Sequence, residues 1–461
     1  MSVSRLTKKI KVKDFFLGTL HFHLFIPAMN SIIIYLLIYL KRIAAMTRDF
    51  VLKGNIVHAV NPGELSVKEN GYLVVRDGNV KEILREYGGE VTDYGNSLII
   101  PGLCDMHVHA PQYAMAGFGL DMELLQWLKT YAFPEESKYS DPGYAAYVYE
   151  AFAKALVAAG TTRACVYGTI HTDTVLMLMD ILESAGITAY VGKVNMDRNA
   201  PEPLCEDTGR SISETKRWLK ECEGRFKHVK PILTPRFIPA CSPALLKSLG
   251  EMAAEYGLPV QSHLSENLSE VEWIKQLEPD AASYGYAYEK YGLFGKGVLT
   301  VMAHCVHSSE KEKSLMAANG VWMAHCPDSN SNLASGMANL RGMLDAGVSA
   351  VLGSDVAGGS TLSMLDVAAK AIRVSKLRQS ARGGKSLTVP EVFYLATSAG
   401  ASFFGEKPGF QAGSPLHAVV IDDAHMVNTP VLSIEERLER AIYMSRDIKL
   451  KAVYAEGRKI L

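Results

Sequence analysis

Two histidines stand one residue apart in PGLCDMHVHAPQY, residues 101–113, directly after an apolar run. If this segment is a β-strand, the side chains of His107 and His109 point to the same face, because alternate residues of a strand face alike. Two neutral imidazoles that converge from one strand end suit a divalent metal such as zinc. His21 and His23 have the same spacing in TLHFHLF without any further sign of a site. The pair therefore needs partners elsewhere in the chain.

Three further apolar runs end in residues of the same kind: His263 in LPVQSH, His304 in GVLTVMAH and Asp355 in GVSAVLGSD. Three histidines and one aspartate, namely His107, His109, His263 and Asp355, predict a mononuclear zinc site with room for a water molecule. His304 either completes the ligand shell or acts beside the metal, and the sequence leaves both roles open. No lysine ends the run at 228–235, where LTPRF stands, so we expect one metal ion rather than two bridged by a modified lysine.

Glu266 lies three residues after His263. A helix that starts there would place Glu266 one turn away, facing the mouth of the same cavity. Close to a metal-bound water, its carboxyl group could move protons during catalysis. A structural interpretation fits as well, since a glutamate in the first helical turn interacts favourably with the helix dipole or joins a capping box. The two roles can hold together.

Eight short apolar runs alternate with longer helical stretches, and they cover residues 97–105, 161–168, 188–195, 228–235, 258–263, 297–304, 320–326 and 347–355. Several runs follow AAG, SAG, YG, NG or AG, where glycine is expected to end a helix. Eight strand–helix units over roughly 250 residues predict an α/β fold of the (β/α)8 TIM-like barrel type, with its active site at the carboxyl ends of the strands. A doubly wound sheet is disfavoured, because no glycine-rich phosphate motif follows the first run.

The two ends of the chain differ from this middle part. Residues 47–100 contain short strand-like runs separated by turn signals such as Asp77-Gly78, and the chain ends in short strands after a helical stretch that starts near Ser386. We therefore expect a small β side domain built from residues 47–100 and 405–461. Residues 101–404 are expected to form the catalytic barrel.

Residues 1–46 form an N-terminal apolar extension. A basic start precedes residues 15–40, which contain no Asp, Glu, Lys or Arg. That length could span a bilayer, yet Pro27, Asn30 and two histidines interrupt it. A mis-set start, with translation beginning at Met46, is favoured over a membrane anchor.

Composition indicates which partner and which compartment to expect. The chain has 48 basic and 49 acidic residues among its 461, a net charge of −1, so we expect no nucleic acid as a partner. Its seven cysteines are scattered and include no C-x-x-C pair, which indicates reduced thiols and a cytoplasmic protein.

With these residues assembled, the chain resembles the amidohydrolase superfamily and, within it, the guanine deaminase family. The superfamily elements are DMHVH, SHLSE, AHC and GSD, and the narrower likeness rests on HAPQY, TPRF, HLSEN, HCPDSN and LGSDVAGG. These motifs spread over the chain from about Met46 onward. One segment departs from the superfamily pattern: PGFQAGSPLHAVVID has Leu416 and His417 where a Phe/Ala-Asp pair is usual.

The resemblance implies hydrolytic deamination of guanine to xanthine and ammonia by a cytosolic homodimer. It implies one Zn²⁺ per chain, with Fe²⁺ as an alternative metal, held by His107, His109, His263 and Asp355. It assigns proton transfer to Glu266 and orientation of the attacking water to His304, with Asp355 accepting a proton from that water. Contacts with the purine are implied for Gln112, Arg236, Phe237, His109, His263 and Asp355.

Arg236 suits guanine because guanidinium donors can hold the acceptor O6 and reject the amino group that adenine carries there. Phe237 can stack on the ring. Taken singly, Arg236 would be expected to form a surface ion pair and Phe237 to pack in the core. Gln112 would be expected in a solvated loop. His171, after the second run, has no assigned role.

Three alternatives to guanine deamination stay open. One is a sister deaminase of S-adenosylhomocysteine or adenine nucleosides, and another is a triazine-type hydrolase; both would share the metal residues without needing TPRF or HAPQY. The third alternative belongs to another class of protein, a non-catalytic barrel that serves as a scaffold. Such a protein would be marked by the loss of one or more metal-ligand residues.

Overall fold

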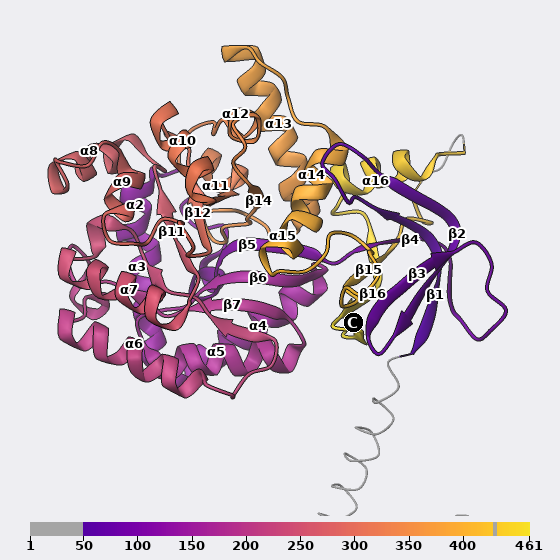
Figure 1. The fold of residues 1–461 in the computed structure, drawn as a ribbon, viewed down its shortest axis with the longest axis horizontal. Helices are drawn as coiled ribbons and strands as arrows, with labels where there is room; N and C mark the ends of the chain where they lie inside the picture. Colours follow the sequence, from indigo (N-terminus) through magenta and orange to yellow (C-terminus); the bar gives the residue numbers. More distant parts are fainter. Residues whose placement is uncertain (1–48, 427–430) are drawn as a thin grey trace, which may run out of the picture. The chain divides into compact units, whose positions relative to one another are not determined.

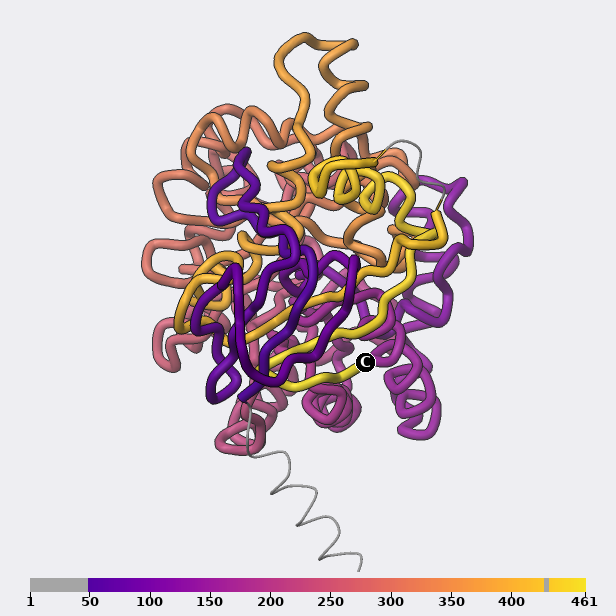
Figure 2. Tube along the Cα trace, turned by 90° about the vertical axis from the view of Figure 1, so that its right-hand side faces the viewer, coloured from indigo at the N-terminus to yellow at the C-terminus, as the bar shows by residue number. Residues whose placement is uncertain are grey.

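Strands from both ends of the chain form one seven-stranded sheet in the computed structural model, which describes residues 49–426 and 431–461. The sheet order is β17-β16-β15-β4-β1-β2-β3, so C-terminal strands pair directly with N-terminal ones (Figure 1). Figure 2 shows this as yellow and indigo tubes side by side. The strands are β1 (Phe50–His58), β2 (Ser66–Arg76), β3 (Asn79–Leu84), β4 (Thr92–Pro101), β15 (Ala418–Asp422), β16 (Lys449–Ala455) and β17 (Arg458–Lys459). The predicted extension of residues 1–46 lies outside the described residues.

The strand β4 joins the two halves of this sheet. It pairs in parallel with β1 and antiparallel with β15, and Pro101 lies opposite Ala418. The prediction of one barrel strand over residues 97–105 is therefore wrong. Residues 97–101 belong to the seven-stranded sheet, and the parallel strand begins only at Leu103, after Gly102.

The remaining main strands form two parallel four-stranded sheets, ordered β5-β6-β7-β9 and β11-β12-β13-β14. The first contains β5 (Leu103–His109), β6 (Thr161–Tyr167), β7 (Thr188–Gly192) and β9 (Val229–Pro231), and the second β11 (Val260–Leu264), β12 (Thr300–His304), β13 (Trp322–His325) and β14 (Ala350–Leu352). A short parallel pair joins β8 (Val194–Asn195) to β10 (Thr234–Pro235). The predicted run at 228–235 is therefore split into β9 and β10.

Two contacts link the parallel sheets. A parallel bridge joins Leu233, after β9, to Val260 at the start of β11. After β14, the backbone N–H of Asp355 donates to the carbonyl of His107 in β5 (2.8 Å), and the N–H of His109 donates to the carbonyl of Val356 (3.1 Å). Every residue of β5 and β6 is buried, as expected for parallel strands covered on both faces.

Helices follow the parallel strands and cover them, as Figure 1 shows for α4 and α5 beside β6 and β7. They are α2 (Leu124–Trp127), α3 (Phe133–Glu136), α4 (Pro142–Ala158), α5 (Thr172–Ala185), α6 (Thr208–Cys222), α7 (Pro243–Tyr256), α8 (Leu268–Leu277), α9 (Tyr284–Glu289), α10 (Glu310–Asn319), α11 (Pro327–Asn332), α12 (Leu340–Asp345), α13 (Met364–Arg382), α14 (Val389–Ala396), α15 (Ser398–Phe403) and α16 (Ile434–Tyr443). Short 3₁₀ helices also occur, and one of them, η2 (Ala110–Met115), contributes to the site described below.

The predicted glycine stops are confirmed at three helices. Gly186, Gly257 and Gly320 end α5, α7 and α10 with positive φ angles of 80°, 63° and 70°. Only glycine adopts this left-handed conformation without a steric cost, which lets the chain turn back into the next strand. Local sequence thus marks where β7, β11 and β13 begin.

The division into a barrel of residues 101–404 and a side domain of residues 47–100 and 405–461 stays a prediction. The helix α16 lies inside the C-terminal segment, for which the sequence predicted only short strands. Among the described residues, no helix has the length and apolar character that a membrane span needs.

Candidate active site

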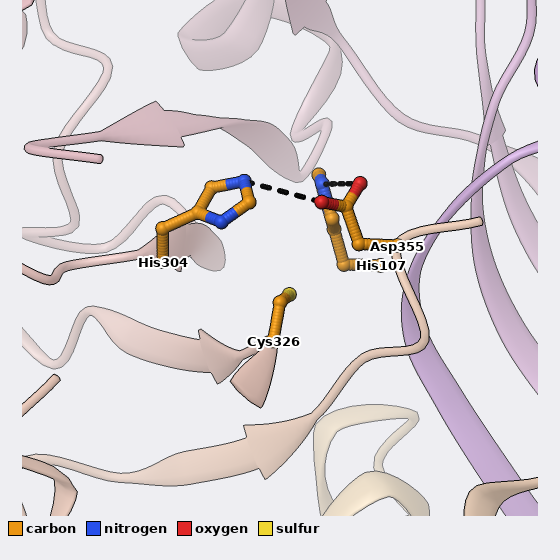
Figure 3. Close-up of side chains that lie close together, drawn as sticks. All are labelled: His107, His304, Cys326 and Asp355. Atoms are coloured by element: carbon orange, nitrogen blue, oxygen red, sulfur yellow. Dashed lines mark ion pairs between the residues drawn. The ribbon is translucent and has the colours of Figure 1, made fainter. Parts of the chain in front are cut away.

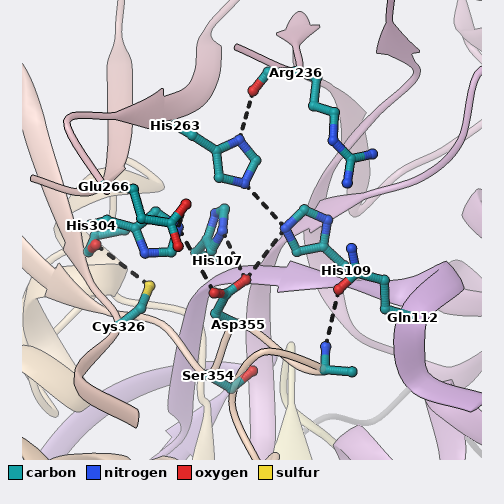
Figure 4. Close-up of polar contacts among 12 residues, drawn as sticks. His107, His109, Gln112, Arg236, His263, Glu266, His304, Cys326, Ser354 and Asp355 are labelled. Atoms are coloured by element: carbon teal, nitrogen blue, oxygen red, sulfur yellow. Dashed lines mark hydrogen bonds and ion pairs between the residues drawn. The ribbon is translucent and has the colours of Figure 1, made fainter. Parts of the chain in front are cut away.

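The structure brings the histidines and the aspartate that were predicted as metal ligands together at one rim of the parallel sheets (Figure 4). Imidazole Nε2 of His107 lies 3.2 Å from Asp355 Oδ1, and Nε2 of His109 lies 3.4 Å from the same oxygen. His263 Nε2 lies 3.3 Å from His109 Nε2. Residues far apart in the sequence meet here because parallel strands present their carboxyl ends at the same rim.

The backbone after β14 places Asp355 by several close contacts. Gly353 packs on β5 so tightly that a Cβ at this position would come 2.7 Å from His107 Cβ. Ser354 donates its backbone N–H and its hydroxyl to the Asp105 carboxylate, at 2.9 and 2.5 Å. Asp355 itself has a φ of 50°, a left-handed conformation that is uncommon outside glycine and is found at functional sites. The hydroxyl group of Ser354 therefore holds the loop that carries Asp355 against β5.

Burial keeps the imidazoles of His107 and His263 neutral. It lowers the pKa of His107 to about 4, and it lowers the pKa of His263 well below its usual value, with the neighbouring His107 and His109 adding to the effect. Burial opposes ionisation of Asp355, but the adjacent imidazoles, His107 first, hold its pKa well below the usual range. The site therefore offers nitrogen lone pairs and one carboxylate, the donor set that zinc prefers.

The geometry fits a metal ion as well as the chemistry does. Ligand atoms that lie 2.0–2.1 Å from a tetrahedral zinc are about 3.3 Å apart. The distances from Asp355 to His107 and His109 and from His263 to His109, which are 3.2–3.4 Å, are close to that value. The Nε2 atoms of His107 and His304 are buried and have no hydrogen-bond partner. Leaving such atoms unsatisfied is costly, and a bound cation would remove that cost.

His304 is held by its other nitrogen. Its Nδ1 lies 2.9 Å from the amide oxygen of Asn330 in α11, which can only accept, so Nδ1 carries the proton. The lone pair of Nε2 then faces Glu266 Oε2 at 3.6 Å and Asp355 Oδ2 at 3.8 Å. His304 also has a left-handed backbone, with φ of 71°. The structure thus presents His304 to the same space as the predicted ligands.

Cys326 is a neighbour that the sequence did not indicate (Figure 3). Its Sγ and the ligand atoms of His107, His304 and Asp355 all lie within 4.8 Å of one another. Burial raises the pKa of the Cys326 thiol well above its usual value, so the sulfur carries a proton at neutral pH. The signal that could have found it is its position at the end of an apolar run, as for His304.

Glu266 lies before a helix rather than inside one. The helix α8 starts at Leu268, and its capping box is made by Asn267 and Glu270. The interpretation of Glu266 as a first-turn or capping residue is therefore wrong: Glu270 has that role and accepts the backbone N–H of Glu266 at 3.0 Å. Burial raises the pKa of the Glu266 carboxyl well above its usual value, and the charges of Asp355 and Glu270 raise it further. A protonated acid thus faces the site.

The residues predicted to hold a purine are buried beside this centre. Arg236 follows β10, and its Nη1 and Nη2 donate to the two oxygens of Glu136 at 2.5 and 2.9 Å. Gln112 in η2 donates to Glu136 Oε1 at 2.8 Å and accepts the backbone N–H of Ala357 at 3.2 Å. The single-residue alternatives of a surface ion pair for Arg236 and a solvated loop for Gln112 are therefore wrong.

Glu136 is the second residue that sequence reasoning missed. Burial alone would raise its pKa, but the Arg236 guanidinium outweighs burial and lowers the pKa of this carboxyl. It stands in the acidic pair PEE of α3, where nothing in the local pattern separates it from a surface residue. Only its contact with Arg236, a hundred residues later, reveals its connection with the site.

One pocket collects these groups and encloses about 490 Å³ of space, including its open mouth. All predicted site residues except His107 line it. The remaining wall is mostly apolar and consists of Leu124, Leu125, Trp127, Leu128, Leu333 and Glu270. Phe237 packs edge-on against Trp273, with ring centroids 6.3 Å apart. His171 does not reach this pocket and instead lines another, between α5 and α6.

Comparisons with known proteins agree with one another. The family model described as the amidohydrolase family matches residues 98–460, which include all the predicted site residues. A guanine deaminase from Rattus norvegicus is 38% identical over 449 residues, covering 91% of this chain and 98% of that protein. A guanine deaminase from Dictyostelium discoideum is 35% identical over 442 residues, covering 89% of this chain and 98% of that protein.

A solved structure is similar over almost the same length. It is guanine deaminase from C. acetobutylicum with guanine bound in the active site, and it superposes with a TM-score of 0.87 at 40% identity. The match covers 90% of this chain and all of that one.

Proposed function

Since the chain belongs to the amidohydrolase family and matches guanine deaminases over almost their whole length, we propose that it hydrolyses guanine to xanthine and ammonia. One observation carries the proposal: the guanidinium and amide donors of Arg236 and Gln112 line the same pocket as Glu266 and Asp355. A purine held by its O6 edge would therefore lie beside the groups that transfer protons. The similar C. acetobutylicum protein holds guanine in its active site.

The amidohydrolase family is metal-dependent, and we assign to this chain one Zn²⁺, held by His107, His109, His263 and Asp355. A zinc ion bound at such a site would lower the pKa of its bound water from near 16 to about 7. The neutral imidazoles and the ionised Asp355 described above match that metal. Imidazole ligands also bind Fe²⁺, so Fe²⁺ is the alternative metal.

Protons move between two carboxyl groups. Asp355 and the unprotonated Nε2 of His304 accept hydrogen bonds from the attacking water and orient it. As the water oxygen adds at C2, one proton of the water passes to Asp355, and Glu266, protonated because it is buried, donates its own proton to guanine N3. Glu266 then takes the proton of the new hydroxyl and passes it to the amino group, and the C2–N bond breaks to release ammonia. The proton held by Asp355 returns to Glu266, which restores both carboxyl groups. One water is consumed, and xanthine remains.

Recognition of the purine would depend on the hydrogen-bond donors of Gln112 and Arg236. Glu136 and the Ala357 N–H fix the amide of Gln112, so its second N–H is free for the substrate. Arg236 likewise keeps N–H groups beyond the two that Glu136 takes. Both side chains offer hydrogen to O6 of a 6-oxopurine, and an amino group at that position would leave donors facing donors, which discriminates strongly. Phe237 offers its ring as a stacking surface.

The finer points of the fold belong to the same proposal. We infer that the parallel strands close into a (β/α)8 barrel, which the Leu233–Val260 bridge and the Asp355–His107 hydrogen bond support. Residues 47–100 and 405–461 would then form the side domain. A homodimer and a cytoplasmic location stay predictions.

A substrate screen tests the function. The purified protein, loaded with Zn²⁺, is incubated separately with guanine, adenine, adenosine, S-adenosylhomocysteine and a chlorotriazine, and products are identified by liquid chromatography. We expect xanthine from guanine and turnover of the others at least a hundredfold slower. Efficient turnover of another substrate, with guanine untouched, would replace the proposal by one of the sister activities, and no turnover at all would favour a scaffold.

A further inference from the structure

The turn between β11 and α8 carries Glu266, and the shape of this turn decides where the Glu266 carboxyl group points. The carboxyl group itself has loose contacts: Ser335 Oγ lies 3.5 Å from Oε1, and His304 Nε2 lies 3.6 Å from Oε2. Both distances are longer than a usual hydrogen bond. The direction of the side chain therefore depends on the backbone that carries it.

That backbone is held from two sides. Ser265 has a φ of 48°, which is uncommon for a residue other than glycine and persists only where the surroundings fix it. On one side, the N–H of His307 donates to the carbonyl of Ser265 at 2.9 Å, and the Ser265 hydroxyl donates to Glu312 Oε2 at 2.7 Å. On the other side, Glu270 Oε2 accepts the N–H of Glu266 at 3.0 Å. Loss of either support would let the turn relax.

Glu270 differs from two other capping-box glutamates of this chain. In α14 and α16, Glu391 and Glu436 accept the N–H of the residue that caps their helix, at 2.8 Å in both cases. The corresponding distance from the Asn267 nitrogen to Glu270 Oε2 is 3.4 Å, and the shorter bond goes one residue further back, to Glu266. Helix capping alone does not account for this arrangement.

Burial also sets Glu270 apart. It is 2% exposed and lines the same pocket as Glu266, whereas Glu436 is exposed. Burying a carboxyl group is costly unless its oxygens are hydrogen-bonded, and here the Tyr284 hydroxyl donates to Oε1 at 2.7 Å. Tyr284 is itself fixed in α9, where its ring stacks on that of Tyr288 with the centroids 5.5 Å apart. Tyr284 thus holds one oxygen of Glu270 while the other holds the turn.

We propose that Glu270, held by Tyr284, is a positioning residue for the proton transfer assigned to Glu266. The inference rests on the proposed deamination, because it concerns the group that would protonate the purine. Glu270 acts through one hydrogen bond, which fixes the peptide group of Glu266 and keeps its carboxyl group facing the pocket. The role needs an acceptor oxygen, which glutamine also has, and the NH₂ group of glutamine can donate to the Tyr284 oxygen. Alanine provides neither.

Steady-state kinetics with guanine test this role in Glu270→Ala, Glu270→Gln and Tyr284→Phe, with bound zinc measured on the same samples. In Glu270→Ala we expect kcat to fall about 100-fold, since a misplacement of about 1 Å has an effect of that size. KM and zinc content should stay near the wild-type values, because Arg236 and the assigned metal ligands are unchanged. Tyr284→Phe should lose about tenfold in kcat, since one of the hydrogen bonds that fix Glu270 is removed. Glu270→Gln should stay within about threefold of the wild type, because it keeps the acceptor.

The matched control is Glu436→Ala, which removes the capping-box glutamate of α16. If Glu270 served only to cap α8, Glu270→Ala and Glu436→Ala would both lower the midpoint of thermal unfolding and both keep the wild-type kcat. We expect the two variants to lose stability alike and to differ in kcat.

Hydrogen exchange gives a readout that does not depend on turnover. Exchange of the amides of residues 264–268, followed by mass spectrometry, should be faster in Glu270→Ala and Tyr284→Phe than in the wild type and unchanged in Glu270→Gln and Glu436→Ala. The inference is overturned if the wild type forms xanthine and Glu270→Ala keeps its kcat within twofold, or if exchange in this segment does not change. Should Glu270→Ala not fold, Tyr284→Phe decides by the same two criteria, because it removes a single hydroxyl group. A wild type that forms no xanthine would instead refute the proposed function, and the exchange data alone would then decide whether Glu270 fixes the turn.

Discussion

Glu136→Gln tests whether a buried carboxylate sets the substrate-binding face of the pocket. Glu136 accepts two hydrogen bonds from Arg236 and one from Gln112, at 2.5, 2.9 and 2.8 Å. Glutamine has the same shape but only one acceptor oxygen, and its NH₂ group would face an N–H donor. The substitution therefore leaves the guanidinium charge without its partner and turns either Arg236 or Gln112 away.

The size of the effect follows from these contacts. A hydrogen bond to a charged group contributes about 1.5–3 kcal/mol, and misplacing a group that positions the substrate costs about a hundredfold in rate. We expect kcat/KM for guanine to fall about 100-fold, which corresponds to about 2.7 kcal/mol of transition-state stabilisation. Since Arg236 and Gln112 are proposed to contact the part of the purine that does not react, most of the loss should appear as a higher KM.

The assay follows xanthine formation at increasing guanine concentration, with bound zinc measured on the same samples. The matched control is Glu135→Gln, because Glu135 is the adjacent buried carboxylate but contacts Tyr144 and Lys138 instead. The control should keep the wild-type kcat/KM. If Glu136→Gln retains zinc and stays within twofold of wild type, the proposed role of this carboxylate in positioning is refuted.

Three further predictions concern other parts of the molecule. Glu266→Gln should keep its zinc by plasma mass spectrometry yet lose about 10²- to 10⁴-fold in kcat; near-normal turnover would remove its role as proton donor. Exhaustive chelation should abolish xanthine formation, and added Zn²⁺ should restore it, whereas activity that survives chelation would contradict the metal assignment. Burial lowers the pKa of His58 to about 4, so the unfolded chain binds the extra proton first and stability falls as the pH drops from about 6.5 to 4, by about 3 kcal/mol from this residue. Urea unfolding at pH 7 and pH 5 should therefore show a smaller pH dependence for His58→Gln, and an unchanged one would refute the assignment.

Much of the site could be predicted because parallel strands impose a simple rule. Residues at the carboxyl ends of such strands meet, so His263, His304 and Asp355 were found from the ends of apolar runs alone. The pair in β5 followed from the alternation of a strand. These inferences need only the order of elements, which glycine stops and apolar runs mark locally.

The parts that were missed depend on contacts that no local pattern encodes. Glu136 and Arg236 are brought together only by tertiary packing, and a glutamate in a short helix looks like any surface residue. The error at residues 97–105 has a related cause: one apolar run continues through Gly102 from the seven-stranded sheet into β5. Sequence shows that both parts are buried strands but not that they pair with different neighbours. His58, which no local pattern singles out, is likewise buried beside Phe410.

The order of the ligands along the chain has a consequence for synthesis. His107 leaves the ribosome long before Asp355, and the hydrogen bond from Asp355 to the His107 carbonyl forms only after β14 has been made. A nascent chain that ends before residue 355 carries the imidazoles without their carboxylate. The proposed zinc site can therefore be completed only once the chain has been synthesised past residue 355, and products that end earlier should emerge without bound zinc.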